Sequence, residues 1–417
     1  MPKRALLSLT FAATLAATMG PFEARAEPYI VIPDPAEIAM DDDTPNIAKW
    51  RSNVLDAYEA AGQPLPEVLS IWTAFPMAGN NYSTYIDPRA NDVQGIGLDA
   101  FFPPDGIKES TTPPLRALLW HNNVHVMDAR ASLHDAPVEG YARYLFLLEL
   151  SHLWGPAARA PMPGESDLIG FPYHWSFFND MASPAGGNAW TDNGDGTFTV
   201  VPGDPATVGF HMLDLYLMGL AEAAEVQPFS VLVNPVVPAT PTDPFWGGAY
   251  APRSFPWFDA SSTLTVTATR RELTIDDVIA ANGPRIPGAG VKTSWTIGFV
   301  LVVAADATAE DVADAKAAFD PIVEGLAPAF SDATMGRGTL EVVTNVAEGG
   351  GGGGAGGAPG TGGSDPGPSS TGSGSEQPPD DADGGDDGCG CRSAKRSDAS
   401  VLGLVLALAL ALRKKRR

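Results

Sequence analysis

The body of this chain lacks cysteine, and the whole chain is poor in basic residues. Among its 417 residues the only cysteines are Cys389 and Cys391, so no disulfide can stabilise the region before them. The 26 Lys and Arg residues are outnumbered by 50 Asp and Glu residues, which gives a formal net charge of −24. Such a surface repels nucleic-acid phosphates, so we expect no nucleic-acid partner.

Several catalytic motifs are missing as well. The sequence contains no serine nucleophile elbow, no phosphate-binding glycine loop and no cysteine-based site. Residues 192–197 look superficially like a calcium loop, but Gly194 and Gly196 interrupt the alternation of ligands, and a hairpin turn is the better prediction. On a strand, His121 and His125 would lie about 13 Å apart, too far for one metal ion.

The N-terminal sequence predicts export. Basic residues Lys3 and Arg4 precede an Ala/Leu/Thr-rich stretch (5–19), and residues 24–26 read Ala-Arg-Ala. A positive region, an apolar stretch and a small-residue cleavage site are the three parts of a secretory signal. We therefore expect a signal peptide over residues 1–26.

The C-terminal sequence has four elements in a distinctive order. A Gly/Pro/Ser/Asp-rich tract (346–388) precedes Cys389 and Cys391, an apolar run (401–412) and five basic residues. The tract cannot bury enough apolar surface to fold and should form a disordered stalk. The apolar run is shorter than the about 20 residues of a permanent membrane span.

This order of elements resembles the MYXO-CTERM sorting signal of myxobacteria and related Gram-negative bacteria. The resemblance covers residues 389–417. It implies cleavage by a sorting protease near Cys389 or Cys391, lipid modification there, and anchoring at the cell surface or outer membrane. The residues alone also allow an ordinary tail anchor with two unmodified thiols.

Between the tails, helical and strand-like patterns alternate along the chain, which predicts an α+β fold. The predicted helices are 46–61, 138–154, 210–225, 274–282 and 309–330. The predicted strands are 68–75, 92–97, 115–127, 262–271, 294–304 and 338–343, with a hairpin over 186–201. The Pro-rich segment 229–257 is expected to be irregular.

The predicted helix 138–154 carries the strongest chemical signal. Glu149 and His152 have the spacing of the last four positions of an H-E-x-x-H zinc motif, in which two His ligands flank a Glu that polarises the bound water. Leu148 stands where the first His belongs. An isolated E-x-x-H is weak, and its simpler interpretation is a partly exposed Glu and a His near the helix end.

The surrounding segments carry a second resemblance. Residues 174–178 read His-Trp-Ser-Phe-Phe, the predicted hairpin contains Asp-Gly-Thr-Phe, and residues 213–220 read Leu-Asp-Leu-Tyr-Leu-Met-Gly-Leu. These segments resemble those of secreted zincin-type metallopeptidase homologues of Gram-negative bacteria. The resemblance implies a zincin-like mixed sheet with an active-site helix over residues 27–226, followed by a smaller α/β region over residues 227–345.

The resemblance also implies roles for individual residues. Glu149 matches the general base, and Tyr216 is a candidate oxyanion donor. His152, His174 and Asp214 are the candidate zinc ligands. Each has an alternative in the protein interior: His174 as a buried core histidine, Asp214 as a cap or ion-pair partner, and Tyr216 as packing.

We therefore expect a surface-anchored metallopeptidase-like protein whose zinc site is degenerate at Leu148. One alternative is a non-catalytic binding or adhesion module that holds a peptide or protein ligand at the cell surface. Another is an active zinc endopeptidase with substitute ligands, and a third is a purely structural envelope protein.

Overall fold

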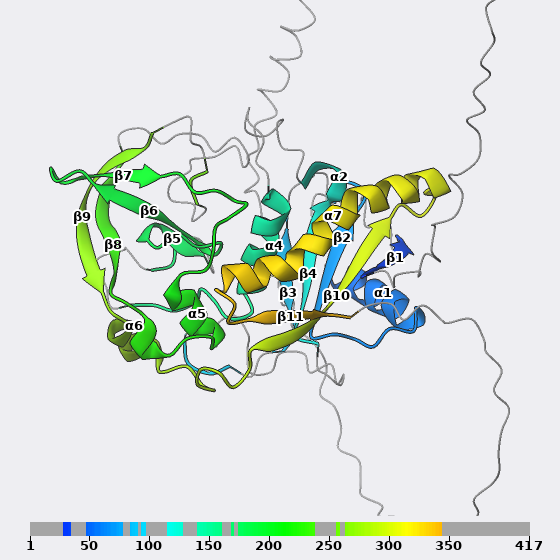
Figure 1. Ribbon diagram of the computed structural model, residues 1–417, viewed down its shortest axis with the longest axis horizontal. Coiled ribbons are helices and arrows are strands. Elements are labelled where there is room, and N and C mark those ends of the chain that lie inside the picture. Colours follow the sequence, from blue (N-terminus) through cyan, green and yellow to red (C-terminus); the bar gives the residue numbers. More distant parts are fainter. Residues whose placement is uncertain are drawn as a thin grey trace, which may run out of the picture.

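The computed structural model describes residues 28–34, 47–77, 84–90, 93–96, 115–127, 140–160, 168–170, 174–237, 256–258 and 263–343 (Figure 1). The predicted signal peptide, the stalk, and the sorting segment with Cys389 and Cys391 lie outside the described residues. Among the described residues, no helix combines the length and apolar character needed to cross a bilayer.

The larger sheet is almost entirely parallel. Its strands follow the order β1-β10-β2-β4-β3, with β11 also paired to β10, and only β3 runs antiparallel to its neighbour. Their bounds are β1 Ile30–Pro33, β2 Val68–Thr73, β3 Tyr85–Pro88, β4 Ala117–Asn123, β10 Ser294–Val303 and β11 Thr339–Val342. Every residue of β2 and β4 is buried, as expected for central strands covered on both faces.

Helices cover the two faces of this sheet (Figure 1). On one face, α4 (Tyr141–Ser151) and α7 (Ala309–Ala333) pack over alternate strand residues such as Ala117 and Leu119. On the other, α1 (Ile47–Ala60) packs over Leu118 and Trp120 through Val54 and Tyr58. The period of two along β4 therefore divides its side chains between two cores.

The second sheet is a closed five-stranded barrel with the strand order β5-β6-β7-β9-β8. Its strands are β5 Trp175–Asp180, β6 Gly186–Asp192, β7 Thr197–Val201, β8 Phe229–Val236 and β9 Thr265–Leu273. Aromatic and aliphatic side chains fill it: Phe177, Trp190, Phe198, Val200, Leu232, Trp257, Leu264 and Val266. Trp175, Phe229 and Leu273 join the main core instead, so the barrel packs against the larger sheet's helices (Figure 1).

Two short helices and a 3-10 turn flank the barrel strands. Helix α5 (Met212–Met218) and the turn Ala223–Glu225 lie between β7 and β8, and α6 (Ile275–Asn282) follows β9. Both sheets recruit strands from both sides of residue 226, because β8 pairs with β5 and β10 pairs with β2. A division of the chain at 226 therefore coincides with neither sheet.

The mixed α+β character predicted from the sequence is confirmed. The predicted helix 210–225 is too long, since α5 ends at Met218, where Gly219 takes a left-handed conformation with φ 78°. The prediction of a single strand over 115–127 is wrong at its end. Residues Val124–Met127 form helix α2, and the Asn123 side chain accepts the His125 backbone N–H at its start. His121 and His125 consequently do not share a strand.

Two further expectations need correction. The segment 229–257, predicted to be irregular, contains strand β8. The described part of the predicted strand 92–97 forms a turn with one isolated bridge, between Gln94 and Ile286.

Candidate functional site

Helix α4 carries the Glu149 and His152 pair, and it is a core helix. It begins after Gly140, whose φ of 76° a side chain would disfavour, and it ends at Ser151, with His152 as its C-cap. All residues from Leu145 to Ser151 are buried, and Leu148 has no exposed surface. Position 148, where the predicted zinc motif lacks its first His, therefore belongs to the apolar core.

Glu149 lies within the protein interior. Its side chain is 1% exposed, and Oε1 accepts a hydrogen bond of 2.7 Å from the Thr84 hydroxyl at the start of edge strand β3. Burial raises the pKa of this carboxyl to about 8, although hydrogen bonds from Thr84 and the Ile86 backbone act in the opposite direction. The group is consequently neutral at neutral pH.

The structure brings together two of the three predicted zinc ligands. The rings of His152 and His174 meet edge to face, with centroids 4.8 Å apart, and both side chains are buried. Burial, followed by the charge of His174, holds the pKa of His152 well below its usual value. Both effects oppose protonation of His152, so we expect a neutral imidazole there.

Asp214, the third predicted ligand, is engaged in other contacts. One carboxyl oxygen accepts the Trp175 indole N–H at 2.7 Å, and the other accepts the His211 backbone N–H at 2.8 Å. With the His211 side chain, which accepts the Leu213 N–H, it completes a capping box at the start of α5. Burial raises the pKa of Asp214, and these hydrogen bonds partly offset that effect.

Tyr216, the predicted oxyanion donor, takes part in the termination of α5. Its hydroxyl accepts the Arg285 backbone N–H at 2.9 Å. The Arg285 guanidinium lies against Gly219 and donates to the carbonyls of Leu217 and Met218, which have no partner within the helix. The geometry thus gives Tyr216 a structural role at this helix end.

These side chains do not fit a catalytic zinc ion. Such an ion needs about three protein ligands and a water molecule. Among the residues that the structure describes, no group of three or more His, Cys, Asp or Glu side chains is placed to hold a metal ion. The described part of the chain offers the His152–His174 pair and no third donor with it.

A small hollow opens between the C-terminal end of α4 and helix α5. Its volume is about 10 Å³, roughly the room that one water molecule needs, and it is lined by Ser151, Trp154, Gly155, Asp214, Leu217 and Met218. Pockets for small molecules usually measure about 300 Å³ or more. This hollow therefore does not serve as a substrate cleft.

Sequence reasoning missed Thr84 near α4, and it considered His121 only as a metal ligand together with His125. Thr84 gives no signal in the sequence, since its partner Glu149 lies 65 residues away along the chain. His121 is fully buried on β4, where it stacks on Trp72 with ring centroids 4.2 Å apart. Within the described residues, neither of its ring nitrogens has a hydrogen-bond partner.

Comparison of the chain with protein families, with curated proteins and with solved structures finds no match.

Proposed function

We propose that this chain is an exported, surface-anchored protein that keeps a metallopeptidase-like scaffold and acts by binding a peptide or protein ligand, without hydrolysing it. The state of Glu149 carries the proposal. Its carboxyl is buried against Thr84, with a pKa of about 8. A general base must be ionised and must reach the proton it removes, and a buried, neutral acid satisfies neither condition.

Three neighbouring positions support the same conclusion. Leu148 contributes packing where a ligand would stand, and Asp214 holds the Trp175 indole and the start of α5. Tyr216 accepts a backbone N–H of Arg285. Within the described residues, each polar residue suggested for catalysis thus has a structural partner.

The second candidate is an active zinc endopeptidase with substitute ligands. One observation favours it, the close approach of His152 and His174. Two imidazoles at this separation are a partial site for zinc, and a third donor would be required. An active endopeptidase would also require Glu149 to ionise, although its burial favours the neutral form.

Peptidase assays on the full-length protein test the proposal. We expect no hydrolysis of a denatured protein substrate by the wild type, by Glu149→Gln or by Leu148→His, with or without added zinc. The reason is that Glu149 is neutral and that a new His at 148 would face the core. Circular dichroism checks that each variant is folded.

Two outcomes would contradict the proposal. Hydrolysis by the wild type that disappears in Glu149→Gln would establish the endopeptidase. Hydrolysis gained by Leu148→His would mean that a single ligand was missing and that the remaining site is intact.

A further inference from the structure

The turn between β6 and β7 holds one of the two Asn-Gly pairs in the chain. Asn193 and Gly194 are exposed, and Gly194 has φ 78° with nothing within 4 Å of where a Cβ would lie. The space beside the Gly194 Cα is therefore open. The Gly194 nitrogen is bonded to the Asn193 carbonyl carbon, so its attack on Cγ of the Asn193 side chain would close a five-membered ring.

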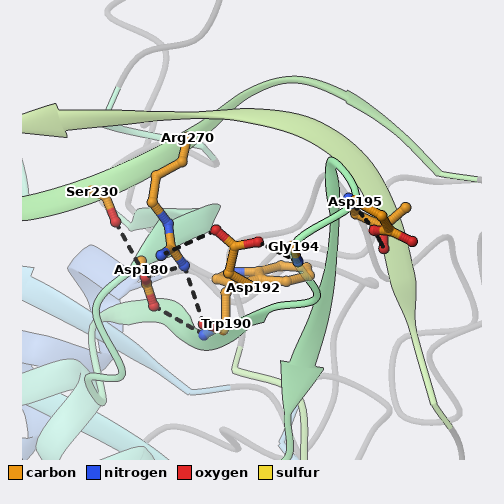
Figure 2. Close-up of polar contacts among 8 residues, drawn as sticks. Asp180, Trp190, Asp192, Gly194, Asp195, Ser230 and Arg270 are labelled. Atoms are coloured by element: carbon orange, nitrogen blue, oxygen red, sulfur yellow. Dashed lines mark hydrogen bonds and ion pairs between the residues drawn. The ribbon is translucent and has the colours of Figure 1, made fainter.

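The N–H of Gly194 donates a hydrogen bond to an aspartate carboxylate. Asp192 Oδ1 accepts the Gly194 N–H at 2.9 Å, as Figure 2 shows. Its other oxygen lies 3.8 Å from the Arg270 guanidinium, which is anchored in turn by Asp180. The ion pair therefore fixes the orientation of the Asp192 carboxylate.

The side-chain nitrogen of Asn193, which would leave as ammonia, is also hydrogen-bonded. The Asn193 Nδ2 atom donates to the hydroxyls of Thr197 and Thr199, at 2.9 and 3.0 Å. The Asn193 side-chain nitrogen is thus bonded to two hydroxyl groups on β7, the strand that follows the turn.

The second Asn-Gly pair, Asn282 and Gly283, has a different environment. Asn282 Nδ2 donates to the carbonyls of Arg159 and Val278, and its oxygen accepts the Arg159 N–H. The Gly283 N–H is bonded to the carbonyl of Ile279, an acceptor that cannot take up a proton. This pair closes helix α6, and three bonds to the backbone hold its side chain.

We propose that Asn193 is a self-modifying site, at which Asp192 acts as the general base for cyclisation and Asn282 stays unmodified. The Gly194 nitrogen bonds to Cγ of Asn193 while Asp192 takes its proton. The C–N bond of the side-chain amide breaks, and the nitrogen leaves as ammonia with the proton that Asp192 took up, which returns Asp192 to its carboxylate form. Water then opens the succinimide ring at either carbonyl, which yields aspartate or isoaspartate.

The product changes the local charge and connectivity. It places a third carboxylate beside Asp192 and Asp195, and it removes the two bonds from Nδ2 to Thr197 and Thr199. Isoaspartate also lengthens the turn's backbone by one carbon. The modification therefore alters the exposed tip of the β6–β7 hairpin and leaves the barrel core untouched.

Peptide mass spectrometry of the full-length protein, incubated folded at mildly alkaline pH, tests the proposal. We expect conversion at Asn193 and little at Asn282. In Asp192→Asn, which keeps an acceptor for the Gly194 N–H but removes the base, conversion should slow by at least about tenfold. Asp306→Asn, the same substitution at an exposed aspartate outside the turn, serves as the matched control and should keep the wild-type rate.

The same incubation in denaturant shows whether the folded geometry or the local sequence determines the rate of conversion at each Asn. Unfolded, the two Asn-Gly pairs should react at similar rates, and Asp192→Asn should have no effect. Faster conversion at Asn282 in the folded protein, no conversion at Asn193, or an Asp192→Asn effect that persists in denaturant would each overturn the proposal.

Discussion

Replacing Glu149 with glutamine is expected to leave the protein folded. The free energy of unfolding should then fall less steeply between pH 4.5 and 8 than it does in the wild type. The pKa of Glu149 is raised from 4.5 to about 8 in the folded state, because burial disfavours the charged carboxylate. Between these values the folded protein binds more protons than the unfolded chain, so the stability that Glu149 contributes is present below pH 4.5 and is lost as pH rises through 8.

The full effect of this linkage is roughly 5 kcal/mol, or somewhat more than about 1 kcal/mol per pH unit across the window. Glutamine cannot ionise, and its oxygen can still accept the Thr84 hydroxyl. The measurement is the free energy of unfolding in urea at a series of pH values between pH 4.5 and 8. Glu59→Gln, at an exposed position on α1, should keep the wild-type slope. Equal slopes for the wild type and Glu149→Gln would show that Glu149 is ionised in the folded protein.

His121 gives the second large expected effect, on the acid side. Its imidazole is fully buried between Trp72 and Phe146, and within the described residues its two nitrogens have no hydrogen-bond partner. A buried polar group without a partner costs about 1–3 kcal/mol. His121→Phe should therefore raise the free energy of unfolding at neutral pH by about 1–2 kcal/mol, allowing for the larger ring.

The same substitution should also change the response to acid. Burial lowers the pKa of His121 from 6.5 to about 3, so between these values the unfolded chain binds more protons and stability falls as the pH drops. His121→Phe removes this contribution. His152, whose pKa is also lowered by burial, retains part of the acid sensitivity.

Urea unfolding at a series of acidic pH values measures this difference. His121→Leu repeats the test with a smaller side chain, in case phenylalanine is too large for the site. His125→Phe is the matched control, since His125 is one-third exposed and faces Asp314; it should change stability by about 0.5 kcal/mol or less. If both variants at 121 were less stable than the wild type at every pH, His121 would have a favourable contact that this account lacks.

The sequence predicts best the elements whose signal is local. The apolar stretch around Leu148 predicts α4, and the Asn193-Gly194 pair predicts the hairpin, because periodicity and turn chemistry act over a few residues. Strand β8 was missed because Asn234 and Pro235 interrupt its pattern. The strand order was not predictable, since β10 joins β2 only after the whole barrel has intervened.

The candidate site shows the same division. The structure places the ring of His152 against that of His174, and their role as zinc ligands stays a prediction. The position of Asp214 on α5 was predicted, but its partners were not, because the Trp175 indole and the backbone N–H at the helix start compete for the same carboxylate. The neutrality of Glu149 depends on burial between α4 and the sheet, which no local pattern of residues reveals.

The central claim is that α4 and its surroundings form a structural core and do not hold a catalytic metal. The most direct test is the zinc content of the purified full-length protein, measured by elemental mass spectrometry after dialysis without chelator. We predict far less than one zinc per chain, with no difference between the wild type and a variant carrying His152→Ala and His174→Ala. Near-stoichiometric zinc in the wild type that is lost in that variant would contradict the claim and would favour the endopeptidase.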